Sequence, residues 1–366
     1  MDLFRKGPSL WKRLTDGMAL HDLWRQLRSE ASSSYGLYSR KKMESETFQR
    51  MPRWKQYARI AAALFWELSA ARRVCLILGL LLLAGGRQEP AQGFMIFGAL
   101  LVLLVLGLEL ADRVTMKRDL EIAREIQGWL VPKTPPPVAG TDIAFITLPA
   151  NTVSGDYYDV FLRPAPPGQP ATERLLLVVA DVAGKSVPAA LLMATFHASL
   201  RTLAGNPMPL VELVSNVNRY TCAHSLGGLR FTTAFLGELD TTTGILRYVN
   251  AGHNHPVLVR SGGTIERLET GGLPLGVNDK ALYQSGESLL SVGDRVIIFT
   301  DGVVEAQNAK EEEYGEARLL ELLKSPLEER SAELLERLMV SLDSFVGTAA
   351  RYDDITLLIL RILPGA

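Results

Sequence analysis

Four short acidic segments hold the residues of this chain that are best suited to carry out chemistry. They are SGDYYD at 154–159, VVADVAGKS at 178–186, IIFTDGVVEA at 297–306 and YDDITLLIL at 352–360. In three of them the acid ends, or comes just before, an apolar and β-branched run typical of a buried strand. Carboxylates that converge at strand ends repel one another unless cations lie between them. Because all-oxygen sites suit Mg²⁺ and Mn²⁺, we predict a two-metal hydrolase.

A simpler interpretation exists for each acid and for several other motifs. A single Asp after a strand is more often a turn or helix-capping residue, but four acids with the same placement favour the metal site. AGKS at 183–186 is not a phosphate loop, because that motif needs Gly five residues before Gly184 and Val179 stands there. His253 and His255 form a weak metal pattern, so we prefer a structured loop beside the cleft. His197 lies in an apolar helix pattern and is interpreted as a packed core residue.

Composition separates a basic front from an acidic back. The chain has 366 residues, which is compatible with two domains and accessory segments. Residues 1–118 hold 19 Lys and Arg against 10 Asp and Glu, whereas residues 119–366 hold 20 against 30. The two cysteines, Cys75 and Cys222, indicate neither a disulfide framework nor a zinc site. We therefore expect a membrane-facing front and a soluble catalytic back, with residues 1–70 as a basic, partly disordered region.

Two strongly apolar runs follow at 74–86 and 94–110, joined by the loop RQEPAQG. About 20 apolar residues span a bilayer, so the second run qualifies and the first needs residues 70–73 as an extension. We predict a two-helix transmembrane hairpin over 71–112. The alternative is a helical hairpin buried in a soluble domain, for which no covering segment is evident. Basic residues flank both outer ends, which places both termini in the cytoplasm and the chain in the inner (cytoplasmic) membrane.

Residues 113–137 are predicted to connect the membrane segment to the catalytic domain. Apolar residues recur at three- and four-residue spacing up to Leu130, and PKTPPP at 132–137 ends this helix as a stiff hinge. Its apolar stripe could form a homodimeric coiled coil, or could pack only on the chain's own catalytic domain.

The remaining segment, 138–363, alternates strand and helix patterns. Hairpin turns and segregated helix pairs predict an α+β layered fold with antiparallel sheets. The predicted helices are 188–203, 210–223, 316–323 and 332–345. The predicted strands are 143–148, 174–182, 231–239, 245–250, 256–260, 264–268, 295–300 and 355–362.

Eight motifs in order resemble the bacterial serine phosphatases that regulate sigma factors. This family belongs to the metal-dependent protein phosphatases, related to protein phosphatase 2C. The resemblance covers about 121–362 and excludes 1–118. The motifs are EIAREIQGWLVP, SGDYYDVF, ADVAGKSVPAALLMA, FTTAFLGELD, AGHNHPVLV, GLPLG, FTDGVVEA and DDITLLIL.

The resemblance implies a four-layer αββα sandwich that holds two Mn²⁺ or Mg²⁺ ions at one edge of its sheets. It implies that the metal ligands are Asp156, Asp181, the backbone carbonyl of Val182, Asp301 and Asp353, with Asp354 as the alternative in register to Asp353. The family's two ions activate a water that attacks phosphoserine or phosphothreonine in line. Asp159 and Glu305 are expected to cap or hydrogen-bond, and Gly155 and Gly184 to let the backbone approach the metals.

This sequence departs from the wider superfamily in one respect that concerns the substrate. Protein phosphatase 2C enzymes hold phosphate with an Arg upstream of the first acid, and TLPANTVSGD at 147–156 contains none. The sigma-regulating branch commonly lacks this Arg too. Ala183 and Ser186 also replace the Ser and Gly of the frequent family pattern DVSGKG, at no cost in ligands.

The implied partner is a phosphorylated anti-anti-sigma protein with a STAS fold. The resemblance also implies that the helix at 121–130 acts as a switch that positions elements such as Gly276. We kept a membrane-anchored scaffold with an inactive phosphatase fold as the alternative, which the four retained acids oppose. A phosphoesterase acting on nucleotides or nucleic acid is disfavoured, because the acidic domain would repel nucleic acid.

Overall fold

The computed structural model describes residues 52–85, 91–168, 173–224, 230–324 and 329–364. The chain divides into two compact units, Met1–Asp112 and Arg113–Ala366. The expectation of partial disorder before residue 52 lies outside the described residues.

The described residues of the first unit form helices. They are α4 (Arg53–Glu67), α5 (Ala70–Gly85) and the first half of α6 (Ala91–Leu130). The helices α5 and α6 touch at two glycines: a Cβ on Gly79 would lie 3.0 Å from the carbonyl oxygen of Gly98. At one end of this pair Arg72 forms ion pairs with Glu109 and Asp112.

Membrane-spanning length is met by α6 but not by α5. Among the described residues two helical stretches are long and apolar enough, Gly93–Leu130 and Ser186–Ala204. The second is α7 of the second unit, whose apolar residues pack in a protein core. The helix α5 begins at Ala70, as the sequence predicted, but its 16 residues are fewer than the roughly 20 that a straight span needs.

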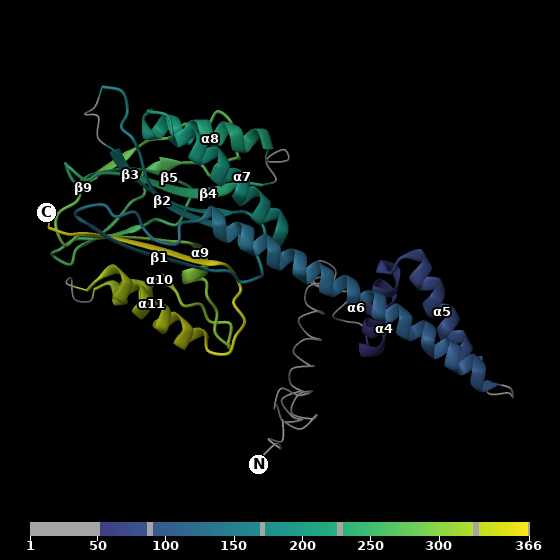
Figure 1. Cartoon of the computed structure of the whole chain (residues 1–366). Coiled ribbons are helices and arrows are strands. Elements are labelled where there is room, and N and C mark those ends of the chain that lie inside the picture. The colour runs from purple at the N-terminus through teal and green to yellow at the C-terminus, as the bar shows by residue number, and fades with distance from the viewer. Residues whose placement is uncertain (1–51, 86–90, 169–172, 225–229, 325–328, 365–366) are drawn as a thin grey trace, which may run out of the picture. The chain divides into compact units, whose positions relative to one another are not determined.

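The second unit contains two mostly antiparallel sheets (Figure 1). The first has the order β1-β11-β10-β6-β7, and the second has the order β2-β3-β4-β5-β8 with β9 paired to β5. The strands of the first sheet are β1 (Thr141–Leu148), β6 (Val257–Val259), β7 (Ile265–Arg267), β10 (Arg295–Phe299) and β11 (Ile355–Ile362). Those of the second are β2 (Asp156–Pro164), β3 (Glu173–Val182), β4 (Thr232–Asp240), β5 (Ile245–Ala251), β8 (Gly271–Gly272) and β9 (Gly286–Leu289).

Strand β3 shows how the sequence separates the packing layers. Its side chains alternate, because successive residues of a strand point to opposite faces. Leu175, Leu177 and Val179 join a core made of residues from both sheets. Leu176 and Val178 join a different core that also contains residues of the helices α7 (Ser186–Ala204) and α8 (Leu210–His224). One continuous apolar run can therefore serve two cores.

The other sheet is covered by a second pair of helices. Leu319, Leu335 and Leu338 share a core with Ile297 and Leu357 of the strands β10 and β11. These leucines belong to α10 (Glu316–Leu323) and α11 (Ser331–Val346), and Figure 1 shows both helices on the side of the unit away from α7 and α8. A single turn, α9 (Asp301–Val304), follows β10.

The predicted mixed α and β organisation is confirmed. Each predicted helix of this unit lies within two residues of an observed one. The sequence did not predict β2, whose polar residues Asp156, Asp159 and Arg163 hide its strand character.

Candidate active site

Strand pairing brings Asp156 and Asp181 together. Asp156 begins β2, Asp181 lies near the end of β3, and the two residues are direct partners in the antiparallel register. The Thr300 hydroxyl donates to Asp156 Oδ2 at 2.8 Å and itself accepts the Thr356 backbone N–H at 2.9 Å. These two bonds connect the first sheet to the buried carboxylate of Asp156, the first residue of β2 in the second sheet.

Asp301 and Asp353 approach the same place from the other sheet. Asp301 opens α9 directly after β10, and Asp353 comes two residues before β11. Burial, and then the charges of Asp301 and Asp353, raise the pKa of Asp181 to about 7. Burial and the charge of Asp181 raise the pKa of Asp156 well above its ordinary value. Burial and the charge of Asp353 likewise raise the pKa of Asp301, so the predicted acids lie within electrostatic reach of one another.

The two neighbouring acids of the DDIT motif have different surroundings. Asp354 accepts three hydrogen bonds, from the backbone N–H groups of Ala150 and Gly155, both at 2.7 Å, and from the Ser154 hydroxyl at 2.9 Å. Asp353 instead faces the other acids and pairs with Lys185 at 2.8 Å. Asp354 therefore holds the SGD loop in place. Of the two neighbours, Asp353 is the carboxylate that is directed at the other acids.

Backbone atoms of the loop between β3 and α7 complete the oxygen-lined region. A Cβ on Gly155 would lie 3.2 Å from the Val182 carbonyl oxygen and 3.8 Å from Asp181 Oδ1. Gly184 has a φ of 127°, a conformation that favours glycine. A Cβ at Gly184 would also collide with Arg230, whose guanidinium donates to the Ala183 carbonyl at 3.1 Å.

The end of α6 contacts this region through Gln127. Its side-chain amide donates to the Ser154 carbonyl at 2.8 Å and accepts the Ser154 backbone N–H at 3.0 Å. Gln127 was not singled out from the sequence, although it lies in the EIAREIQGWLVP motif. Arg230 and Lys185 were missed as well, because each acts through a neighbour that is distant in sequence.

Other acids and histidines named from the sequence have structural partners. Asp159 is fully buried, accepts two hydrogen bonds from Arg201, at 2.6 and 2.7 Å, and accepts one from the Tyr157 hydroxyl. His197 contacts the same Tyr157 hydroxyl at 3.2 Å. Buried His253 lies 3.1 Å from the Thr233 hydroxyl, and burial lowers its pKa to about 4. Gly276 donates its backbone N–H to Asn218 of α8 at 2.9 Å.

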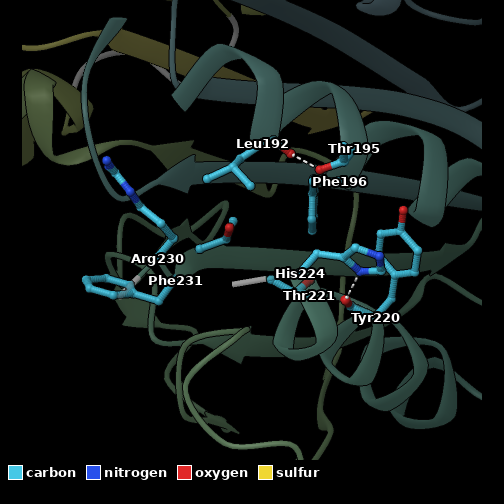
Figure 2. Close-up of a pocket in the computed structure, with 9 residues that line it drawn as sticks. Leu192, Thr195, Phe196, Tyr220, Thr221, His224, Arg230 and Phe231 are labelled. Carbon is cyan, nitrogen blue, oxygen red and sulfur yellow. Dashed lines mark hydrogen bonds between the residues drawn. The ribbon is translucent and has the colours of Figure 1, made fainter. Parts of the chain in front are cut away.

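Two hollows adjoin these elements. Figure 2 shows the smaller one, where Leu192 and Phe196 of α7 and Tyr220 of α8 surround a cavity of about 20 Å³, with Arg230 and Phe231 at its edge. This cavity has room for about one water molecule, not for a substrate. The larger is an open groove of about 410 Å³ beside α9, the turn that begins with Asp301. It is lined by Asn254, His255, Arg267, Glu269, Phe299, Val304, Glu305, Glu313, Gly315 and Glu316.

The donor set fits hard divalent cations. It consists of carboxylates and a backbone carbonyl, and their crowding leaves an excess of negative charge. Among the described residues no three acidic, His or Cys side chains lie close enough together to hold an ion by themselves. Mg²⁺ commonly takes only one or two carboxylates from a protein and keeps several waters.

Comparisons with known proteins identify the family of this chain. The family model of Stage II sporulation protein E (SpoIIE) matches residues 171–363. Protein IcfG of Synechocystis is 28% identical over 68% of this chain and 42% of its own length. The phosphoserine phosphatase RsbU of Bacillus subtilis is 28% identical over 67% of this chain and 70% of its own length. This chain thus spans less than half of IcfG.

Solved structures show the same fold. The RsbU and RsbW domains of Rv1364c from Mycobacterium tuberculosis match with a TM-score of 0.52 at 29% identity, over 64% of this chain and 62% of theirs. The SiaA-PP2C domain of Pseudomonas aeruginosa matches with a TM-score of 0.59 at 21% identity, over 69% of this chain and 99% of its own. The family resemblance drawn from the motifs is confirmed: the chain belongs to the SpoIIE family of PP2C-like serine phosphatases.

Proposed function

We propose that this chain is a metal-dependent protein serine/threonine phosphatase. The observation that carries the proposal is the convergence of Asp156, Asp181, Asp301 and Asp353 from two sheets. Burial and the neighbouring acids raise the pKa of Asp156, of Asp181 and of Asp301. We assign these four carboxylates and the Val182 carbonyl as ligands of two Mn²⁺ or Mg²⁺ ions. We also propose that the two sheets and their two helix pairs form the four-layer αββα sandwich implied by the family, which the shared cores of helices and strands support.

When bound, the two ions would supply an activated water and neutralise charge on the phosphoryl group. The chain's residues would position that chemistry. Thr300 orients Asp156 by a hydrogen bond, and Asp354 fixes the loop that carries Asp156. No side-chain nucleophile is required, in keeping with the sequence, which has only two cysteines, Cys75 and Cys222.

The groove beside Asp301 supports a protein substrate. Glu305 and Glu313 line it, and burial together with the charge of Asp301 raises the pKa of Glu305. A groove of about 410 Å³ accommodates residues that flank a phosphoserine. The relatives RsbU and RsbP of Bacillus subtilis are named phosphoserine phosphatases. From the family we infer that the partner is a phosphorylated STAS-type anti-anti-sigma protein.

Residues 71–112 are proposed as the membrane anchor of the inner membrane, with both termini in the cytoplasm. The support is the apolar length of α6 and the basic residues that follow its apolar run, Arg113, Lys117 and Arg118. The helix α5, with 16 residues, would cross with local thinning of the bilayer. We retain the wider division into a basic region 1–70, this anchor, a linker 113–137 and a phosphatase domain 138–363. A homodimer through the linker helix is part of the proposal, since Val114, Ile122 and Ile126 are exposed on it.

The test is hydrolysis of p-nitrophenyl phosphate by the full chain in detergent, with and without Mn²⁺. We expect Mn²⁺-dependent activity that falls at least about a thousandfold in Asp181→Asn, because a metal ligand is lost. Asp279→Asn is the matched control, since Asp279 is exposed and outside the site. An inactive wild-type chain, tested also on a phosphorylated partner, would favour the inactive scaffold instead.

A further inference from the structure

The turn between β3 and α7 brings one cation into the acidic site. Lys185 stands between Gly184, with a φ of 127°, and Ser186, with a φ of 63°. Positive φ is uncommon for a residue other than glycine, so the turn at Ser186 holds a restricted backbone conformation. Lys185 ends this turn as the residue before α7. Its side chain is thereby directed to the segment that precedes β11.

Three contacts hold the Lys185 ammonium group beside Asp353. Nζ lies 2.8 Å from Asp353 Oδ2 and donates to the Tyr352 carbonyl at 2.9 Å. It also lies 4.2 Å from the centroid of the Tyr352 ring, within the range of a cation–π interaction. The side chain remains 43% exposed, so a ligand in solvent can reach it.

Lys185 is in direct contact with a proposed metal ligand, Asp353, in the part of the chain that the structure describes. Among the ion pairs of the described residues, Lys185–Asp353 is the one that includes any of the four proposed ligands. Arg230 is near, but its guanidinium is bonded to the Ala183 carbonyl. Arg201 is bound to Asp159. The segment 147–156 contributes no arginine.

We propose that Lys185 binds a phosphoryl oxygen of the phosphoserine substrate and so serves as the phosphate-holding cation of this site. A phosphate monoester carries nearly two negative charges near neutral pH, and lysine is a common phosphate ligand that acts as a point charge. The three anchoring contacts place that charge at the edge of the carboxylate cluster, within reach of a phosphoryl group bound there. This inference rests on the proposed function, because it names the substrate contact of the same site.

The alternative is that Lys185 only orients Asp353 for metal binding. The two roles differ in what they do to the metal. A cation bound at Asp353 and the Lys185 ammonium compete for the same carboxylate oxygen, so removing Lys185 leaves Mn²⁺ affinity unchanged or tighter if its task is phosphate binding. If Lys185 instead orients Asp353 for the metal, removing it weakens Mn²⁺ binding.

The test compares three variants of the full chain in detergent. Lys185→Met removes the charge and keeps a long side chain, and Lys185→Arg keeps the charge. Lys324→Met is the matched control, because Lys324 pairs with Glu321 at an exposed site on α10. Calorimetry measures the affinity of inorganic phosphate for the Mn²⁺-loaded protein, and separate titrations measure Mn²⁺ affinity. Kinetics with p-nitrophenyl phosphate separates KM from kcat.

We expect Lys185→Met to bind phosphate at least about tenfold more weakly and to raise KM by a similar factor, with Lys185→Arg within about threefold of wild type. The control should match wild type. Phosphate affinity that is equal in Lys185→Met and wild type, or undetectable in wild type, overturns the inference, as does a parallel loss of Mn²⁺ affinity. Phosphate binding that depends on Lys185 in a chain without hydrolytic activity would overturn the proposed function and leave this inference standing.

Discussion

Asp354 accepts the backbone N–H of Gly155 at 2.7 Å, across 199 residues of sequence. This bond ties the segment before β11 to the loop that carries Asp156. Together with the bonds from Ala150 and Ser154, it makes the second acid of the DDIT motif a structural clamp. The first acid, Asp353, remains directed at the other carboxylates.

The two acids should therefore respond differently to neutralisation. Asp354→Asn replaces an acceptor oxygen with an NH₂ group that faces N–H and O–H donors, so we expect a loss of about 2–4 kcal/mol in unfolding free energy. Asp353→Asn should retain stability within about 1 kcal/mol and lose Mn²⁺ affinity at least about tenfold. Urea unfolding of metal-free protein and calorimetric Mn²⁺ titration measure the two effects. Equal stability losses in both variants would contradict the division of roles.

The raised pKa of Asp181 predicts how stability depends on pH. Its value is about 7 in the folded protein against 3.8 as the ordinary value, so the folded state holds the proton more tightly. The metal-free protein should lose up to a few kcal/mol as the pH rises from about 4 to about 7. Asp181→Asn should flatten this part of the curve. Urea midpoints at several pH values with a metal chelator present check this, and an unchanged slope in the variant would refute it.

Metal affinity should change with pH in the opposite direction. Carboxylate ligands must lose their protons to bind a cation, and protons are held up to about pH 7 at Asp181. We therefore expect Mn²⁺ to bind at least about tenfold more tightly at pH 8 than at pH 6, with proton release. Calorimetry in buffers of different ionisation enthalpy measures the released protons. Binding without proton release would show that the acids are already ionised.

Gly302 of the TDG motif is required by close packing. A Cβ there would collide with the backbone carbonyl of Asp354. That carbonyl cannot shift without disturbing the hydrogen bonds that the Asp354 side chain accepts. We expect Gly302→Ala to lose at least about 2 kcal/mol of unfolding free energy. Gly262→Ala is the matched control, because a Cβ at Gly262 meets nothing within 4 Å. It should change stability by no more than about 0.5 kcal/mol, and a similar effect at both glycines would refute the packing argument.

The contact between Gln127 and Ser154 leads us to expect that the linker helix affects metal binding. Gln127→Ala removes two hydrogen bonds to Ser154, next to the clamped loop. We expect a loss of about 1–2 kcal/mol in unfolding free energy and weaker Mn²⁺ binding. Glu125→Ala, an exposed change two residues away on the same helix, is the control for helix propensity. Unchanged Mn²⁺ affinity in Gln127→Ala would mean that the contact is structural only.

The sequence by itself determined the elements and the chemical character of the site. Apolar runs at strand and helix periods set the limits of α7, α8, α10 and α11 within two residues, because side-chain burial follows those periods. The order of the acidic motifs was enough to assign the family. The strand β2 was not predicted from the sequence, because its buried charged residues have partners that lie far along the chain. Arg201, the partner of Asp159, is an example.

Only the tertiary structure distinguishes the contacts of two adjacent acids, Asp353 and Asp354. Asp353 and Asp354 are adjacent acids, and the sequence motif predicted Asp353 as the ligand with Asp354 as the alternative in register. Only the folded chain brings the N–H groups of Ala150 and Gly155 to Asp354 and the ammonium group of Lys185 to Asp353. Hydrogen bonds and ion pairs act over a few ångströms between residues up to 204 positions apart, and no local pattern in the sequence encodes them.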